Sequence, residues 1–216
     1  RSLCAQTVRY SRKQTAVEGD ASKPAPGGGL YYSWVFSPAA HPSRHLLLTS
    51  QRNLRFILTL IQRVLRDGAL IENLRQGGVN DKDEINRRMK DADTKYGFKL
   101  FLSLGKRLGI IVPHKGPGAR FVMTDSLLRY FILTLLEPRN NCSYEDFLDR
   151  LYANHGIAVE GDNLRDSIAF SNLPPNLSTE YDDSSWLREM LRAGGFLTEL
   201  SDGYSIVSNT FETIEQ

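Results

Sequence analysis

The 216-residue chain is long enough for one large domain or for two modules of about 100 residues, each with its own core. Its apolar runs fall far short of the roughly 20 residues that a membrane-spanning helix needs, and it starts at Arg1 without a signal-type hydrophobic region. Two cysteines, Cys4 and Cys142, suit neither a disulfide framework nor a zinc site. We therefore expect a soluble piece of a longer protein, cytoplasmic or, in a eukaryote, nuclear, without a membrane partner.

The net charge of +2 hides a strong asymmetry around Thr124. Residues 1–124 (the first half) contain 21 Lys and Arg against 9 Asp and Glu, whereas residues 125–216 (the second half) contain 6 against 16 and no Lys. A basic surface attracts phosphates and an acidic surface repels them. The first half is therefore the candidate for nucleic-acid binding. Alternatively, the opposite charges hold the two halves against each other.

Residues 1–49 are predicted to form a flexible or extended N-terminal arm. A basic cluster at residues 9–13 precedes a stretch rich in Pro and Gly at residues 21–29, which cannot support a packed element. Residues 30–36 are rich in aromatic and β-branched side chains and predict a short strand. Its aromatic side chains could stack on bases, although packing against the domain is their commoner role.

Residues 50–124 are predicted to form a basic domain. Helical spacing covers residues 51–66, a short apolar piece at residues 69–71 favours a strand, and a helix capped by Asn80 or Asp81 continues from Lys82 to about Asp93. An amphipathic helix over residues 94–108 then ends at Gly109. The apolar residues 110–112 and 121–123 surround a turn with two glycines, which predicts a hairpin.

Residues 125–216 are predicted to repeat this order in an acidic domain. The expected elements are helices over residues 126–137, 144–152, 162–170 and 186–192, a brief extended piece at residues 156–159, and a hairpin over residues 196–207 around an Asp-Gly turn.

Two segments share one pattern: LGKRLGIIVPHKGPGARFVMT at residues 104–124 and LREMLRAGGFLTELSDGYSIVSN at residues 187–209. Each resembles the last helix and the wing of a winged helix-turn-helix domain. The resemblance covers most of residues 50–210 and is to a broad superfamily. It implies a mainly α fold with small β-hairpins (α+β), in two tandem domains. In such domains the last helix enters the major groove of DNA and the wing touches the backbone, although some members dock proteins instead.

The resemblance implies seven contact residues for nucleic acid: Lys95, Lys99, Ser103, Lys106 and Arg107 on or beside the helix, and Lys115 and Arg120 at the tip of the hairpin, as the wing contacts. Each phosphate contact would add salt dependence. The helix is also apolar at Phe98, Leu100, Phe101, Leu102 and Leu104. This favours backbone contacts over base reading. Alternatively, the helix is buried and its lysines are merely solvated.

The second copy carries acidic residues at the matching positions: Asp182, Asp183, Glu189, Glu199 and, at the wing tip, Asp202. Carboxylates near phosphates cost free energy. The second half is therefore predicted to bind a protein partner or to form a homodimer.

No enzyme signature, cofactor site or metal site is predicted. His41 and His45 have no carboxylate or cysteine cluster beside them, residues 115–118 lack the Gly-Lys-Ser/Thr ending of a phosphate loop, and Cys142 has no His nearby in sequence. The leading hypothesis is a module that binds DNA, as duplex rather than single strand. The alternative is a scaffold without nucleic-acid binding, whose two wings are buried in a larger assembly.

Overall fold

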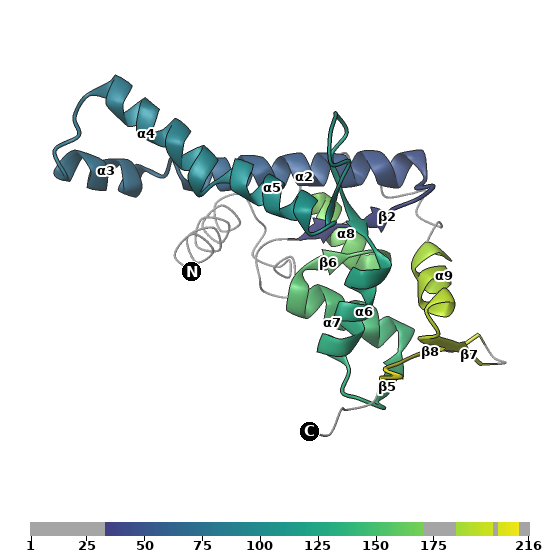
Figure 1. Cartoon of the computed structure of the whole chain (residues 1–216). Coiled ribbons are helices and arrows are strands. Elements are labelled where there is room, and N and C mark those ends of the chain that lie inside the picture. The colour runs from purple at the N-terminus through teal and green to yellow at the C-terminus, as the bar shows by residue number, and fades with distance from the viewer. Residues whose placement is uncertain (1–32, 171–184, 201–202, 212–216) are drawn as a thin grey trace.

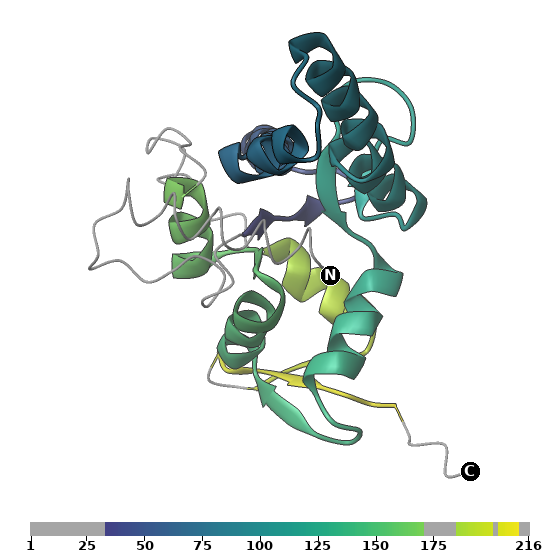
Figure 2. The same cartoon turned by 90° about the vertical axis from the view of Figure 1, so that its left-hand side faces the viewer.

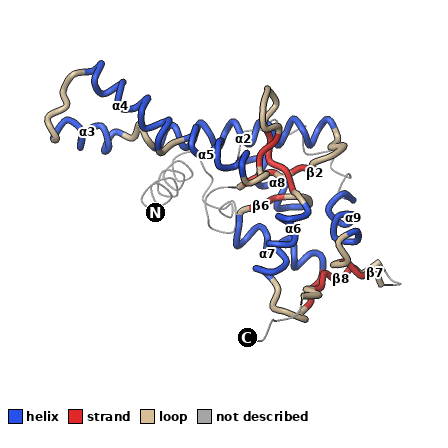
Figure 3. The backbone as a smooth tube through the Cα atoms, in the orientation of Figure 1, coloured by secondary structure: helices blue, strands red, loops and turns tan. Residues whose placement is uncertain are grey.

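The computed structural model describes residues 33–170, 185–200 and 203–211 of the chain, and they form a mixed α+β fold (Figures 1 and 3). The helices are α2 (Arg44–Val64), α3 (Gly68–Gln76), α4 (Lys82–Lys95), α5 (Phe98–Arg107), α6 (Asp125–Leu135), α7 (Tyr144–His155), α8 (Gly161–Phe170) and α9 (Ser185–Ala193). The strands are β1 (Trp34–Val35), β2 (Ser37–Pro38), β3 (Ile111–Val112), β4 (Arg120–Met123), β5 (Asn141–Ser143), β6 (Ile157–Ala158), β7 (Leu197–Glu199) and β8 (Ser205–Ser208).

The strands form three small sheets in the described part. Two of them have three strands each, in the orders β2-β4-β3 and β5-β8-β7, and the third is the pair β1-β6. β2 runs parallel to β4 of the first half, while β1 runs parallel to β6 of the second half. The segment from Trp34 to Pro38 therefore joins elements of both halves.

Buried hydrogen bonds hold this segment against α2. Asn53 is fully buried, its Oδ1 accepts from the Val35 N–H (2.9 Å), and its Nδ2 donates to the Ser33 carbonyl (3.2 Å). Ser37 Oγ donates to the Phe121 carbonyl (2.9 Å). Polar groups of a segment between two layers need such partners because water does not reach them.

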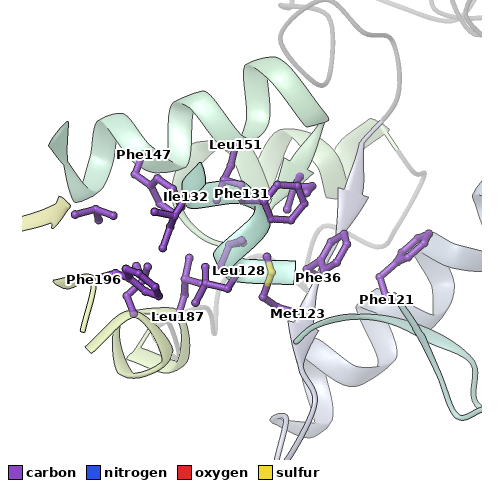
Figure 4. Close-up of a cluster of buried hydrophobic side chains, with 14 of the residues drawn as sticks. Phe36, Phe121, Met123, Leu128, Phe131, Ile132, Phe147, Leu151, Leu187 and Phe196 are labelled. Carbon is purple, nitrogen blue, oxygen red and sulfur yellow. The ribbon is translucent and has the colours of Figure 1, made fainter. Parts of the chain in front are cut away.

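The main hydrophobic core continues across Thr124. Phe36, Phe121 and Met123 belong to the same buried cluster as Leu128 and Phe131 of α6 (Figure 4). A division into domains at residues 50 and 124 stays a prediction. The described residues 33–49 contain two buried strands and the start of α2, and residues 1–32 lie outside the described part.

Two local predictions about α2 and α3 are wrong. The first helix starts at Arg44, seven residues before the predicted start at Gln51. Residues 69–71 belong to helix α3 rather than to a strand, because Asp67 Oδ1 accepts from the Ala69 N–H (2.9 Å) and caps a new helix. α3 and α4 project away from the core (Figure 1).

Capping and hairpin predictions are confirmed. Asp81 caps α4 and Ser143 caps α7, each accepting a hydrogen bond from the backbone N–H three residues later. The antiparallel pairs β3-β4 and β7-β8 occupy the two predicted hairpins. The Ser201-Asp202 part of the second turn lies outside the described residues.

Candidate nucleic-acid interface

The candidate interface starts where α4 ends and α5 begins. α4 stops at Lys95, and Gly97 precedes the first residue of α5. A Cβ on Gly97 would lie 2.6 Å from Leu65 Cδ1 and 3.0 Å from Asp93 Cα, so glycine permits this close approach. Lys95 therefore belongs to α4, and the prediction of one continuous helix over residues 94–108 is wrong.

An ion pair fixes the end of α4 against the end of α2. Arg66 donates from Nη1 to Asp93 Oδ1 (2.8 Å) and from Nη2 to Asp93 Oδ2 (2.5 Å), and Asp93 is 5% exposed. The hydrogen bonds from Arg66 lower the pKa of the Asp93 carboxyl, and the charge of Lys99 contributes in the same direction. The pair thereby orients the start of the candidate interface.

The hairpin turn is attached to two helices. Gly116 (φ 94°) and Gly118 (φ 84°) adopt the left-handed backbone conformation that glycine reaches without steric cost. Lys106 Nζ donates to the His114 carbonyl (3.2 Å), and Gln51 Nε2 donates to the Gly118 carbonyl (3.2 Å). The turn is therefore held in place by both α5 and α2.

Six of the seven predicted contact residues lie at the surface of this unit: Lys95 at the end of α4, Lys99, Ser103, Lys106 and Arg107 on α5, and Lys115 in the hairpin turn. None of the five basic ones forms an ion pair within the described part of the chain. Lys99 Nζ donates only to the neutral Thr94 Oγ1 (3.3 Å). No described carboxylate is within ion-pair distance of these five charges.

Arg120 does not lie at the tip of the hairpin. It is the first residue of β4, half-buried, and donates from Nε to Ser37 Oγ (3.3 Å) and from Nη2 to the Ala39 carbonyl (3.1 Å). Burial lowers the pKa of its guanidinium. The side chain thus links the hairpin to β2 instead of extending with the turn.

The solvent side of α5 has a basic flank. Lys99, Ser103 and Lys106 recur at spacings of four and three residues, which places them on one side of the helix, and Arg107 lies next to them. Three apolar side chains face inwards and pack against the core: Phe98, Phe101 and Leu102. The helix is therefore only partly buried.

The other flank of α5 is apolar and exposed. Leu100, Leu104 and Leu108 follow at intervals of four residues, and Tyr96 precedes them in the turn between α4 and α5. Their exposed fractions are 39%, 45%, 69% and, for Tyr96, 65%. We call these four residues the apolar ridge. The apolar sequence of this helix left open that it is buried. The structure buries part of its inner side only, and this flank stays exposed.

Sequence reasoning did not assign a binding role to four arginines of α2: Arg44, Arg52, Arg55 and Arg63 (the arginine face). All four are exposed, and none forms an ion pair within the described residues. The available signal was the absence of Asp and Glu from all 21 residues of the helix.

In the second half, four arginines pair with neighbouring carboxylates: Arg150 with Asp146, Arg165 with Asp162, Arg188 with Glu145, and Arg192 with Glu199. The predicted residue Glu199 is therefore partly neutralised, whereas Glu189 is exposed and pairs with no described residue. Asp182, Asp183 and Asp202 lie outside the described part. The contrast in charge between the halves thus persists at the surface.

Residues considered for other chemistry are dispersed. Cys142 lies in β5 and is buried, and this burial raises the pKa of its thiol. His41 precedes α2 while His45 lies within it. Among the described residues, no three His, Cys, Asp or Glu side chains come together as metal ligands would.

The structure defines the chain as a mixed α+β protein with small sheets. No protein-family model, curated protein or solved structure matches the chain. Within the described ranges, no helix has both the length and the apolar character needed to cross a bilayer.

Proposed function

We propose that the first half binds the phosphate backbone of duplex DNA through the basic flank of α5 and the hairpin turn, and that the second half docks a protein. The observation that carries the proposal is the gathering of Lys99, Lys106, Arg107 and Lys115 on one helix and its adjoining turn without ion pairs among described residues. Such side chains release condensed counterions when they contact phosphates.

The order of elements supports the proposal. α5 is followed by Gly109 and an antiparallel hairpin, and α9 is followed by Gly194-Gly195 and a second one. This arrangement resembles the last helix and wing of winged helix-turn-helix domains, in which both parts meet one duplex. Tandem winged-helix domains are accordingly part of the proposal.

Contacts to the backbone are favoured over base reading. The side chains of the apolar ridge offer no hydrogen-bond donor or acceptor apart from the Tyr96 hydroxyl. Base edges are distinguished mainly by hydrogen bonds, so little of α5 can read sequence. We therefore expect similar affinities for duplexes of different sequence.

The test replaces Lys99, Lys106, Arg107 and Lys115 together with glutamine. We expect roughly 30-fold weaker binding to a 20-base-pair duplex at 100 mM NaCl, because four phosphate contacts are lost. The slope of log affinity against log salt should become less steep by roughly three to four. Fluorescence anisotropy with a labelled duplex at 50, 100 and 200 mM NaCl measures both quantities.

The matched control replaces Lys82, Arg87, Arg88 and Lys90 of α4 with glutamine. This control also removes four positive charges from the first half of the chain, at exposed positions outside α5 and the hairpin. An equal loss of duplex affinity in the two quadruple variants would mean that the effect comes from the net charge of the chain and not from a site. Unchanged affinity in the first variant would contradict the proposed DNA site.

A second candidate function, docking of a protein on the first half, is favoured by the apolar ridge. Exposed apolar surface flanked by basic side chains suits an amphipathic helix with acidic edges. On this hypothesis the two hairpin units belong to a larger assembly and do not bind DNA.

A designed peptide tests this candidate directly. We expect a helical peptide with leucines at every fourth position and glutamates beside them to bind the chain, and replacement of Leu100, Leu104 and Leu108 by serine to weaken this binding at least tenfold, since each leucine loses burial worth about 1.5–3 kcal/mol. Replacement of the exposed Tyr130 and Leu133 of α6 is the control. If duplex affinity, and not peptide affinity, falls in the leucine variant, the second candidate is wrong.

A further inference from the structure

The longest helix of the described part carries an unusual charge pattern. α2 has 21 residues, four arginines and no acidic residue. Its first turn lacks the acidic side chain that would favourably meet the positive end of the helix dipole, and Arg44 lies there instead. This helix end therefore places positive charge next to positive charge.

The four arginines lie on one side of α2. Successive residues turn by about 100°, so spacings of eight, three and eight residues keep them within an arc of about 100°. The buried side chains Leu46, Leu54, Ile57 and Ile61 lie on the opposite side, against the core. The arginine face thus points away from the rest of the molecule.

Four other arginines of the first half are neutralised locally. Arg75 of α3 pairs with Glu72, and Arg87 and Arg88 of α4 both pair with Glu84. Arg66, directly after α2, pairs with Asp93. Against this background, the arginine face is a row of charges with no described partner, and like charges three or four residues apart repel each other along a helix.

We propose that the arginine face is a second nucleic-acid site, which binds the phosphate backbone of a duplex without reading its sequence. Guanidinium groups contact phosphate oxygens through paired hydrogen bonds. The face extends from Arg44 to Arg63, about 28 Å at 1.5 Å per residue, a length that corresponds to about eight base pairs at 3.4 Å each. The arginine face is separate from the α5–hairpin site, and binding to it does not depend on that site.

The composition of the face favours nucleic acid over a lipid surface. Helices that lie in a membrane interface insert large apolar side chains next to their basic ones. None of the large apolar side chains of α2 is exposed; Leu47, Leu48, Phe56 and Leu58 are half-buried. The large apolar residue within the arc of the arginines is Leu48, and because it is half-buried this face offers a bilayer little apolar area. Phosphates on a duplex need only the guanidinium groups.

The position of α2 makes the two sites separable. α2 packs beside α5, and Figures 1 and 2 place the two helices next to each other on the same side of the molecule. Because each helix has its own exposed side, variants of the arginine face leave the basic flank of α5 unchanged.

The test replaces Arg52, Arg55 and Arg63 with glutamine, a good helix former that preserves α2. At 100 mM NaCl we expect about tenfold weaker binding to the 20-base-pair duplex, and a salt slope less steep by about 2.7 if each arginine contacts one phosphate. The matched control replaces Arg75, Arg87 and Arg88 with glutamine, which removes the same charge from paired positions. It should change affinity less than threefold.

The outcomes separate the alternatives. Loss confined to the α2 variant, with unchanged circular dichroism, supports the arginine face. Equal loss in both triple variants, or no loss in either, overturns it. Retained duplex binding with lost binding to phosphatidylserine vesicles would also overturn it in favour of a membrane site. If the α5–hairpin variant loses affinity and the α2 variant does not, the proposed function stands without this inference.

Discussion

Replacement of Phe121 by alanine is expected to lower the free energy of unfolding by about 3–5 kcal/mol, the range for removing a buried phenyl ring. Phe121 is fully buried in β4. Its ring centroid lies 5.1 Å from that of Trp34 and 5.6 Å from that of Phe36, both stacked, and 6.5 Å from that of Phe101. The substitution therefore leaves a cavity where the N-terminal segment, α5 and the hairpin meet.

Urea denaturation followed by circular dichroism measures this loss. Tyr130→Ala is the matched control, since it removes a similar ring at a position that is 54% exposed, and it should cost less than about 1 kcal/mol. Phe121→Leu should cost less than Phe121→Ala because it fills part of the cavity. Equal destabilisation by the two alanine variants would show that the ring cluster does not hold these elements together.

Local signals predicted much of the fold. Asp81 and Ser143 were recognisable as caps because a short polar side chain precedes a run with helical spacing, and both cap their helices. The hairpins follow from apolar pairs around glycine turns. These features depend on residues within a few positions of each other, so all the interacting residues can be recognised in one short segment of the sequence.

Features that depend on distant residues could not be predicted in this way. β1 and β2 pair with strands far along the chain, at Ile157–Ala158 and Val122–Met123, and no periodicity specifies such a register. The start of α3 was obscured because Asp67-Gly68 has the composition of a helix end, although the aspartate caps the next helix. The break at Gly97 reflects contact with Leu65, which local spacing does not report.

In the candidate site, too, features set by nearby residues could be predicted and features set by distant residues could not. Spacing alone was enough to gather Lys99, Ser103 and Lys106 on one flank of α5. Arg120 was misplaced because its partners, Ser37 and Ala39, lie more than 80 residues away. Exposure of Leu104 depends on which side of α5 meets the core, and that is a property of the tertiary packing.

The segment from Trp34 to Pro38 changes how the charge asymmetry is understood. β2 joins the sheet of the first half, β1 pairs with β6 of the second, and Phe36 lies in a core with residues from both. Apolar packing and backbone hydrogen bonds thus connect the halves. These contacts hold the halves together without attraction between opposite surface charges, which salt would screen. The basic charges of the first half are therefore available to a ligand.

Replacement of Asp93 by asparagine is expected to lower the free energy of unfolding by about 2 kcal/mol at pH 7, because charge-assisted hydrogen bonds to a buried carboxylate are worth about 1.5–3 kcal/mol. The bidentate pair with Arg66 is lost, while the partly exposed guanidinium regains water. Thermal unfolding at a series of pH values measures the effect. Glu84→Gln is the control, since its pairs with Arg87 and Arg88 lie at the surface, and it should destabilise far less.

The pH dependence separates this ion pair from simple packing. Arg66 lowers the pKa of Asp93 in the folded state, so the unfolded chain binds the proton more tightly. The stabilisation is therefore fully present above about pH 5, beyond the usual aspartate range, and is lost as the pH falls through the lowered pKa of the folded state. The difference between wild type and Asp93→Asn should narrow accordingly from pH 5 to pH 2. A difference that stays constant over this range would mean that shape, and not charge, holds the end of α4 against α2.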